Sequence, residues 1–410
     1  MEPTIRAVTP DTFVVYSNAI STAFGGGPRT PEQLAEDARD FAYDRGFAAF
    51  DGDAIVATIV GLSFDLTLPG LTTIPVGGIT GVGVLPTHRR RGLLRGVMAR
   101  ELDTIAARGE AVAILTATES SIYGRFGFGV ATVATDVEID RRHAAFNRPP
   151  ASDGALTLID HDRAAAILPD LYNRVRWRQP GAITRSPERW ARYLRSFAQE
   201  RHGASPMFVV TYTAASGEVE GAAWYRIKEH WEGFISAGTV LLRELVAITS
   251  EAEAALWHFC LNIDLTTTVQ AQDRPLDEPL RWQLTDPRRL RVTRLTDDLW
   301  VRVLDVPVAL AARRYATRDR LVFAVTDSFR PATAGRYELV GAPDDATCRR
   351  TEDSPDLTLD IADLGAVYLG GARFGMLLRA GRVVEHVAGA VQRADLLFFT
   401  DPAPRCATPF

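Results

Sequence analysis

The feature that most constrains this chain is a strongly basic turn between an apolar strand and an amphipathic helix. Residues 81–85 are apolar and end at Pro86, and the run His88-Arg89-Arg90-Arg91-Gly92 follows. A helix is expected from Gly92 onward, because the apolar residues after it recur on one helical face. Gly109 stands where a C-terminal cap is expected, and another short strand is expected at 111–117.

A loop of this kind favours a phosphorylated ligand. Backbone N–H groups and the helix dipole attract anions to a helix N-terminus. Glycine lets the backbone approach closely, and arginine adds charge-assisted hydrogen bonds. The ligand implied is a diphosphate or a larger phosphorylated cofactor, although a solvated basic turn would have the same sequence. The loop contains neither GK[ST] nor GxGxxG, which argues against a P-loop NTPase and a Rossmann dehydrogenase.

Length and composition indicate a multidomain globular protein. The 410 residues favour two or three domains, and 46% hydrophobic with 24% charged residues is ordinary for such proteins. A net charge of -5 argues against nucleic-acid binding. Cys260, Cys348 and Cys406 lie far apart, which argues against a disulfide framework or a zinc site and fits a reducing cytoplasm. Neither a signal peptide nor a membrane span is expected, so we expect a cytoplasmic protein.

Two segments rich in proline divide the chain into three α+β blocks. These segments are 147–154 and 272–289, and they predict domains at 1–146, 147–290 and 291–410. The strands expected by pattern lie at 46–50, 54–64, 81–85, 111–117, 207–213, 221–227, 234–240, 299–305, 321–326, 335–340 and 357–361. The helices expected beyond the basic loop lie at 164–177, 187–199, 251–261, 307–315, 371–378 and 388–397. Residues 299–305 alternate as a half-buried strand does.

Two motifs together resemble a known family. Arg89-Arg90-Arg91-Gly92-Leu93-Leu94 is similar to the pyrophosphate loop Q/R-x-x-G-x-G/A of the GCN5-related N-acetyltransferases (GNATs), with Leu94 at the position of the small residue. That loop, followed by Ile122-Tyr123-Gly124-Arg125-Phe126-Gly127-Phe128-Gly129, resembles the enhanced intracellular survival (Eis) family of mycobacterial and related acetyltransferases. The likeness covers essentially the whole chain, continuing through Asp140-Arg141-Arg142, Leu256-Trp257 and Leu299-Trp300-Val301-Arg302 to the C-terminal Phe410.

The resemblance implies a definite architecture. An active GNAT domain (1–146) is followed by a degenerate GNAT-like domain (147–290) and a sterol-carrier-protein-like α/β domain (291–410) that ends in the catalytic C-terminus. The sequence supports the degeneracy independently, because Leu245–Ile248 leads into Ser250-Glu251-Ala252-Glu253 without an Arg or Gly cluster. Acidic residues there would repel a pyrophosphate, so no cofactor is expected in that domain. The family assembles as hexamers, so a homo-hexamer is expected.

The resemblance also implies acetyl-CoA as co-substrate, no metal, and a set of site residues. The cofactor contacts that it implies are Val82, Gly83, Val84, Arg90, Arg91, Gly92, Leu93, Leu94, Arg95, Thr118 and Glu119. Val82 and Val84 also suit plain core packing, and Glu119 equally suits a surface carboxylate.

Two residues are implied as catalytic groups. Tyr123 is the general acid, which fits a phenol with a reference pKa of about 10. The terminal carboxylate of Phe410 is the general base. Its reference pKa of about 3.3–3.7 must be raised by burial or by a neighbouring carboxylate for this role.

The acceptor implied is a primary amine of a polycation such as an aminoglycoside, at one or several positions, or a protein lysine. Two features depart from the mycobacterial pattern, which has acidic residues at both places: Pro409 and the run Gly25-Gly26-Gly27. Asp37 and Asp40 are candidate replacements, although with Glu32 and Glu36 they equally suit a solvated helix face. The alternative functions are lipid binding by the third block and acetyl-CoA binding without turnover.

Overall fold

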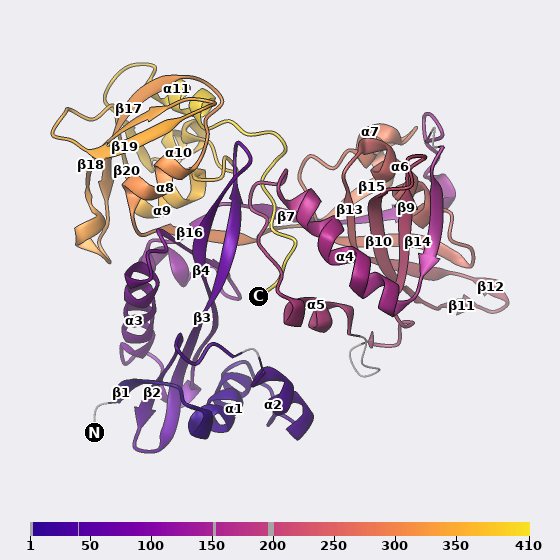
Figure 1. Ribbon diagram of the computed structural model, residues 1–410, viewed down its shortest axis with the longest axis horizontal. Coiled ribbons are helices and arrows are strands. Elements are labelled where there is room, and N and C mark those ends of the chain that lie inside the picture. Colours follow the sequence, from indigo (N-terminus) through magenta and orange to yellow (C-terminus); the bar gives the residue numbers. More distant parts are fainter. Residues whose placement is uncertain (1–2, 40, 151–152, 196–200) are drawn as a thin grey trace. The chain divides into compact units, whose positions relative to one another are not determined.

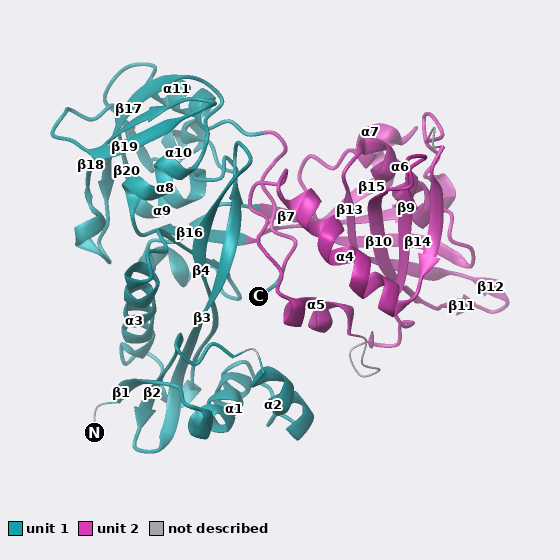
Figure 2. Cartoon of the chain, viewed as in Figure 1, with its two compact units in different colours: residues 1–132, 299–400, 409–410 teal, residues 133–298, 401–408 magenta. Residues whose placement is uncertain are grey.

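The structure is a computed structural model that describes residues 3–39, 41–150, 153–195 and 201–410. The chain forms two compact units (Figure 2). Unit 1 contains Met1–Thr132, Leu299–Thr400 and Pro409–Phe410, and unit 2 contains Val133–Asp298 and Asp401–Thr408. The chain therefore passes from one unit to the other four times, and the units do not coincide with the three segments that the sequence pattern delimits.

The first sheet of unit 1 carries the N-terminal part of the chain (Figure 1). Its described strands are, in spatial order, β1 (Thr4–Ala7), β2 (Gly46–Asp51), β3 (Ala54–Leu68), β4 (Thr72–Val84), β5 (Val112–Thr116), β16 (Leu299–Val303) and β6 (Gly129–Val130). The helices of this part are α1 (Phe13–Ala23), α2 (Pro31–Asp37) and α3 (Leu93–Ala107). Neighbouring strands are antiparallel except for β4 and β5, which run parallel.

Helix α3 has the apolar face that the sequence predicts. Val97, Met98, Leu102 and Ile105 are buried against the sheet in one core cluster. Gly109 follows the helix with a φ of 78°, a left-handed conformation that costs glycine little. The expected order of strand, basic loop, helix and strand between residues 81 and 117 is confirmed.

Strand β16 corrects one expectation. The pattern in 299–305 predicts a half-buried strand, but all five residues of β16 are buried. The strand pairs with β5 from Leu299–Thr116 to Val303–Val112 and with β6 on its other side, so it is an interior strand with both edges paired. Arg302 is accommodated because its guanidinium pairs with the equally buried Asp327 at 2.5 Å.

The remainder of unit 1 is a smaller α/β arrangement. Its described strands are, in spatial order, β19 (Ala346–Arg350), β18 (Gly335–Gly341), β17 (Asp319–Thr326), β20 (Leu357–Asp360) and β21 (Val383–Glu385). Its helices are α8 (Val306–Ala312), α9 (Ile361–Val367), α10 (Phe374–Arg379) and α11 (Ala390–Leu397). The rings of Phe323, Phe374 and Phe398 pack together in its core, with centroids 5.1 to 6.1 Å apart.

Unit 2 is built on a second sheet of the same kind. Its described strands are, in spatial order, β15 (Leu290–Asp297), β7 (Val133–Asp140), β14 (Thr266–Arg274), β13 (Gly238–Ala247), β10 (Val219–Lys228), β9 (Phe208–Thr213) and β8 (Ala155–Ile159). The short strands β11 (Trp231–Glu232) and β12 (Ile235–Ser236) form a hairpin beside it. The helices are α4 (His161–Arg176), α5 (Pro187–Leu194), α6 (Ser250–Leu261) and α7 (Leu280–Gln283). As in the first sheet of unit 1, only one pair among the described strands of this sheet, β13 and β14, is parallel.

One strand expected in unit 2 has other bounds in the structure. The expected strand at 234–240 is divided between β12 and β13: Phe234 lies in the turn of the β11–β12 hairpin, and Ala237 separates the two strands. The segment 272–289 contains the end of β14 and all of α7, and both elements belong to unit 2. No helix among the described residues is long and apolar enough to span a membrane.

A buried carboxyl lies in the core of unit 1. Glu101 on α3 is fully buried, and neither of its carboxyl oxygens has a hydrogen-bond partner among the described residues. Burial raises its pKa to about 7, and Arg45 opposes this only in part because Arg45 forms its own buried pair with Glu110 at 2.6 Å. Glu101 therefore binds a proton more tightly in the folded than in the unfolded chain.

This proton predicts a pH-dependent stability. Because burial raises the pKa of Glu101 from its ordinary value of 4.5 to about 7 on folding, the favourable contribution of its protonation to stability is complete below pH 4.5 and is lost as the pH rises to about 7. Between pH 5 and pH 8 the free energy of unfolding of the wild type should fall by on the order of 2 kcal/mol more than that of Glu101→Gln, measured by urea unfolding at both pH values. Asp53 is exposed, so Asp53→Asn is the control and should show the same change in unfolding free energy with pH as the wild type. If Glu101→Gln and the wild type lost the same unfolding free energy between pH 5 and pH 8, Glu101 would not be the group responsible.

Candidate active site

The site begins where the parallel strands β4 and β5 separate. Their last paired residues are Gly78 and Ile114. Beyond this point β4 stays paired with β3 through Val84, whereas β5 pairs with β16. The two strands therefore diverge, and the edge of β4 that faces β5 is left without a strand partner over its last residues. We call this gap the β4–β5 opening.

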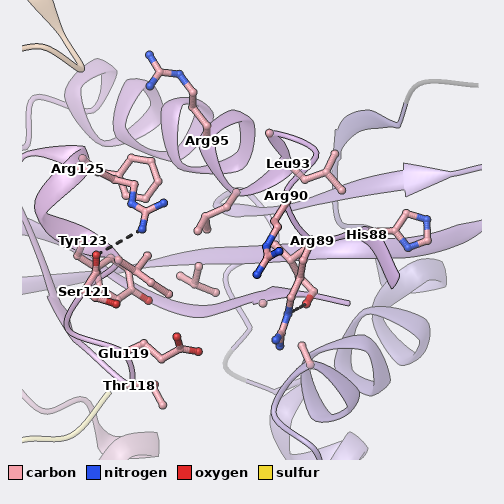
Figure 3. A pocket seen from close by; sticks show the side chains of 18 of the residues that line it. His88, Arg89, Arg90, Leu93, Arg95, Thr118, Glu119, Ser121, Tyr123 and Arg125 are labelled. Atoms are coloured by element: carbon pink, nitrogen blue, oxygen red, sulfur yellow. Dashed lines mark hydrogen bonds between the residues drawn. The ribbon is translucent and has the colours of Figure 1, made fainter. Parts of the chain in front are cut away.

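The opening leads into a cavity of about 870 Å³ within unit 1. The end of β4, the basic loop, the start of α3 and the segment after β5 form its walls (Figure 3). The lining residues are Ala23, Phe24, Val82, Gly83, Val84, His88, Arg89, Arg90, Gly92, Leu93, Leu94, Arg95, Thr118, Glu119, Ser121, Ile122, Tyr123, Arg125 and Phe126.

The N-terminus of α3 offers free backbone donors at the cavity wall. Gly92 precedes the helix with a φ of 80°, and no side chain caps it. The first helical hydrogen bond runs from Gly96 N to Gly92 O at 3.1 Å, so the N–H groups of the first turn have no partner within the helix. Arg90 also has a positive φ, 63°, which is rare for a residue with a side chain and is found at functional loops.

The arginines around the cavity have different surroundings. The guanidinium groups of Arg89 and Arg90 lie at the cavity in Figure 3, and Arg89 Nε donates to Val84 O at 3.4 Å. The Arg95 guanidinium instead lies over the ring of Phe329, 4.8 Å from its centroid. Arg91 is not among the lining residues, and its guanidinium donates to Thr87 O at 3.2 Å.

The net charge of the walls suits an anion. Four arginines line the cavity, and Glu119 is the one carboxylate among its lining residues in the described chain. His88 contributes no free ring nitrogen, because its Nε2 is 3.2 Å from Asp51 and its Nδ1 is 2.8 Å from Thr87. The described residues contain no group of His, Cys, Asp or Glu side chains arranged to hold a metal ion.

Tyr123 faces the same cavity from a short 3-10 helix, Tyr123–Phe126. Only 7% of its surface is exposed, and its ring packs edge-on against Phe128. Burial, followed by the charge of Glu119, raises the pKa of the phenol above its ordinary value of 10. The hydroxyl therefore remains protonated at neutral pH and is able to donate a proton.

Phe410 lies at the base of the β4–β5 opening on unit 1. Its ring packs on Phe64 of β3 with centroids 5.1 Å apart. A Cβ atom at Gly78 would lie 3.1 Å from the Phe410 ring and 2.4 Å from Phe64, so glycine leaves the room that these rings fill. Gly78 is also the last β4 residue that pairs with β5. Phe410 is nevertheless not one of the residues that line the cavity.

The structure thus brings together most of the residues expected from the sequence. Tyr123 and all expected cofactor contacts except Arg91 line one cavity. Arg89, Ser121 and Arg125 also line it, and their signal in the sequence is their position within the two motifs. Neither the Gly25-Gly26-Gly27 run nor the expected acidic helix face lines it; Asp37 pairs with Arg29 at 3.7 Å, and Asp40 lies outside the described residues.

Comparisons with known proteins agree with this geometry. A family model described as an acetyltransferase (GNAT) domain matches residues 4–131, and a second model with the same description matches 181–303. A sterol carrier protein domain model matches residues 306–407. The expected fold class, two GNAT folds followed by a sterol-carrier-protein-like domain, is therefore confirmed.

Relatives match this chain over most of its length. An uncharacterized N-acetyltransferase of Streptomyces avermitilis is 39% identical over 406 residues, 98% of each chain. N-acetyltransferase Eis of Mycobacterium tuberculosis is 31% identical over 363 residues, 88% of this chain and 87% of that one. The crystal structure of Eis1 from Mycobacterium abscessus superposes with a TM-score of 0.87 at 33% identity, covering 99% of this chain and all of the other. This chain belongs to the Eis family of N-acetyltransferases.

Proposed function

We propose that the protein transfers the acetyl group of acetyl-CoA to a primary amine of a polycationic acceptor, such as an aminoglycoside or a lysine. The observation that carries this proposal is the β4–β5 opening, which combines a basic helix N-terminus with a protonated phenol in one cavity. The active domain is the N-terminal part of unit 1, followed by a degenerate GNAT domain and a sterol-carrier-protein-like domain.

The walls of the cavity fit acetyl-CoA. The first-turn N–H groups of α3, together with Arg89 and Arg90, would bind the phosphates. Val82, Gly83 and Val84 carry backbone groups on the open edge of β4, where an extended amide-containing arm would pair like an added strand. Thr118 and Glu119 line the opposite wall after β5. When bound, acetyl-CoA supplies the acetyl thioester.

Tyr123 is proposed to act as the general acid. In the transfer, a C–N bond forms to the amine and the C–S bond breaks, so the departing sulfur needs a proton. The Tyr123 phenol stays protonated at neutral pH because burial raises its pKa. It faces the cavity and returns to its acid form by taking a proton from solvent.

The terminal carboxylate of Phe410 is proposed to take the proton of the acceptor ammonium. Support comes from the ring of Phe410, which fills the space above Gly78 where β4 and β5 begin to diverge. The ring holds the end of the chain beside the opening, and the carboxylate is attached to the same residue. We also propose that the protein assembles as a homo-hexamer, as its resemblance implies.

Acetyl-CoA-dependent thiol release by untagged protein tests the function as a whole. The panel contains aminoglycosides, polyamines and lysine peptides. Release with particular amines would support the proposal and identify the acceptor class. Acetyl-CoA binding without release for any amine would favour the second candidate, a cofactor-binding protein without turnover, and lipid found bound by mass spectrometry would favour a lipid carrier.

Arg90 and Arg91 should differ in their effect on acetyl-CoA. Arg90→Gln should raise the KM for acetyl-CoA about 10-fold, because a charge-assisted hydrogen bond to phosphate is lost. Arg91→Gln is the matched control. It should change the KM for acetyl-CoA by less than about 2-fold, because the Arg91 guanidinium is directed to Thr87 O and an exposed charge of this kind contributes little. Equal effects of the two substitutions would contradict the proposed phosphate site.

Tyr123→Phe should lower kcat by about 100-fold, the lower end of what one acid–base group supplies. The Kd for acetyl-CoA, measured by calorimetry, should be unchanged because the ring still fills its place against Phe128. Tyr225→Phe, which removes a phenol from the core of unit 2, is the control. An unchanged kcat in Tyr123→Phe would contradict the role of Tyr123 as general acid.

A single glycine added after Phe410 should abolish most activity. The ring keeps its packing on Phe64, but the carboxylate moves by one residue and the former terminus becomes a neutral amide. We expect kcat to fall by about 100-fold, in the range for loss of a general base. Phe410→Leu retains the carboxylate and is the control, with a smaller loss. Normal turnover by the extended chain would exclude the terminal carboxylate as base.

A further inference from the structure

Unit 2 contains an opening built like the one in unit 1. Its parallel strands β13 and β14 pair up to Leu242 and Ala271 and then diverge. Beyond this point β13 stays paired with β10 through Ala247, as β4 does with β3, and α6 follows β13 as α3 follows β4. We call this gap the β13–β14 opening.

The chemistry of the β13–β14 opening differs from that of a cofactor site. Glu251 and Glu253 lie in the first turn of α6, and the side chain of Thr249 caps the helix. Arg274 at the end of β14 donates to Leu245 O of β13 at 3.4 Å and pairs with Glu278 at 2.7 Å. The opening is thus crossed by a buried side chain, and its helix N-terminus carries negative charge that would repel phosphates.

The C-terminal segment of the chain lies at this opening. Residues 401–408 belong to unit 2, although the residues on both sides of them belong to unit 1. Pro402, Arg405 and Ala407 line a cavity of about 300 Å³ together with the end of β13, the first turn of α6 and the end of β14. The chain's own terminus therefore forms part of the wall of the second opening.

Four hydrogen bonds to the backbone of this segment hold it in place. They are Ala403 N to Asp277 Oδ2 at 2.8 Å, Gln179 Nε2 to Ala403 O at 2.8 Å, Arg405 N to Pro180 O at 2.8 Å and Cys406 N to Asp298 Oδ2 at 3.3 Å. Gly181 has a φ of 90°, and a Cβ atom there would lie 3.0 to 3.1 Å from the backbone of Arg405. The close approach of the two backbones therefore depends on glycine.

Arg185 anchors the end of the segment. Its Nε donates to Thr408 Oγ1 at 2.8 Å and its Nη2 to Glu244 of β13 at 2.9 Å, with both charged side chains almost completely buried. The hydroxyl of Tyr172 lies 2.9 Å from Thr408 Oγ1. The rings of Tyr172, Trp190 and Tyr193 surround the guanidinium at 3.8 to 4.9 Å.

This anchor is specific for the chain's end. Only 1% of the surface of Thr408 is exposed, and Cys406 is 3% exposed. If the segment left the site, the Nε donor of buried Arg185 would lose its partner, which is costly for a charged group. The Nε donor of Arg185 thus has its Thr408 partner only with the C-terminal segment present, while Glu244 pairs with its Nη2.

We propose that the β13–β14 opening is a binding site for the chain's own residues 402–408, anchored by Arg185 and Glu244, at the place where an active GNAT unit binds its cofactor. Thr408 lies two residues before Phe410, so an anchored Thr408 restricts the chain end to a radius of about 7 Å. Arg185 and Thr408 are therefore positioning residues for the terminal carboxylate, a consequence that rests on the proposed function.

Hydrogen–deuterium exchange of the full chain tests the site without reference to activity. Thr408→Val keeps the shape of the side chain but removes the hydroxyl that bonds Arg185 and Tyr172. Exchange of the backbone amides of Ala403 and of residues 405–408 should then accelerate at least about 10-fold, since a hydrogen bond to a charged group is lost. Thr408→Ser retains a hydroxyl that can bond Arg185. Its amide exchange rates should therefore stay within about 3-fold of the wild-type rates, because the hydrogen bond is at most weakened. Unchanged exchange in Thr408→Val would overturn the proposal.

Two further measurements on the same samples separate this site from the catalytic proposal. In Thr408→Val, kcat should fall while the KM for acetyl-CoA is unchanged; faster exchange with normal kcat would support the binding site and contradict the role of Phe410. Calorimetry of wild type should give one acetyl-CoA per chain. A second equivalent of acetyl-CoA that competes with protection of the C-terminal segment would overturn the proposal.

Discussion

The separation of two parallel strands is the constraint on which the site depends. Because β4 and β5 stop pairing at Gly78 and Ile114, the edge of β4 is open and the start of α3 faces a cavity. A continuous sheet would have satisfied that edge with strand hydrogen bonds and left no space for a ligand. Gly78 is the last β4 residue that pairs with β5, and its missing side chain also leaves room there for the ring of Phe410.

The same strand geometry occurs twice in the chain, and charge distinguishes the two openings. In unit 1 the helix after the strand is preceded by three arginines and begins with free N–H groups. In unit 2 the corresponding helix is capped by Thr249 and has glutamates in its first turn. The backbone provides an opening in both units, but only the first has the charge to attract a phosphorylated cofactor.

The sequence was sufficient to predict local structure and the cavity walls. The helical periodicity after Gly92 and the glycines at its ends predict α3, and the two motifs name most of the lining residues, because these residues are close in sequence. Long-range pairing was not predictable. β16 inserts between β5 and β6 from almost 200 residues away, and its buried Arg302 resembles a surface residue until Asp327 is seen beside it. Arg185 and Thr408 are 223 residues apart and carry no motif.

Binding of the C-terminal segment gives the second unit a physical reason to keep its fold. A chain terminus normally frays, because few contacts offset the entropy of ordering its last residues. Here residues 403–408 gain hydrogen bonds from a folded unit, and the buried Arg185–Glu244 pair gains a donor–acceptor match that water would otherwise have to supply. Burying this ion pair costs desolvation free energy. We therefore expect the Arg185–Glu244 pair to contribute specificity for the C-terminal segment rather than net stability. The second GNAT fold is well suited to this task, because its diverging strands already provide a preformed opening for an extended ligand.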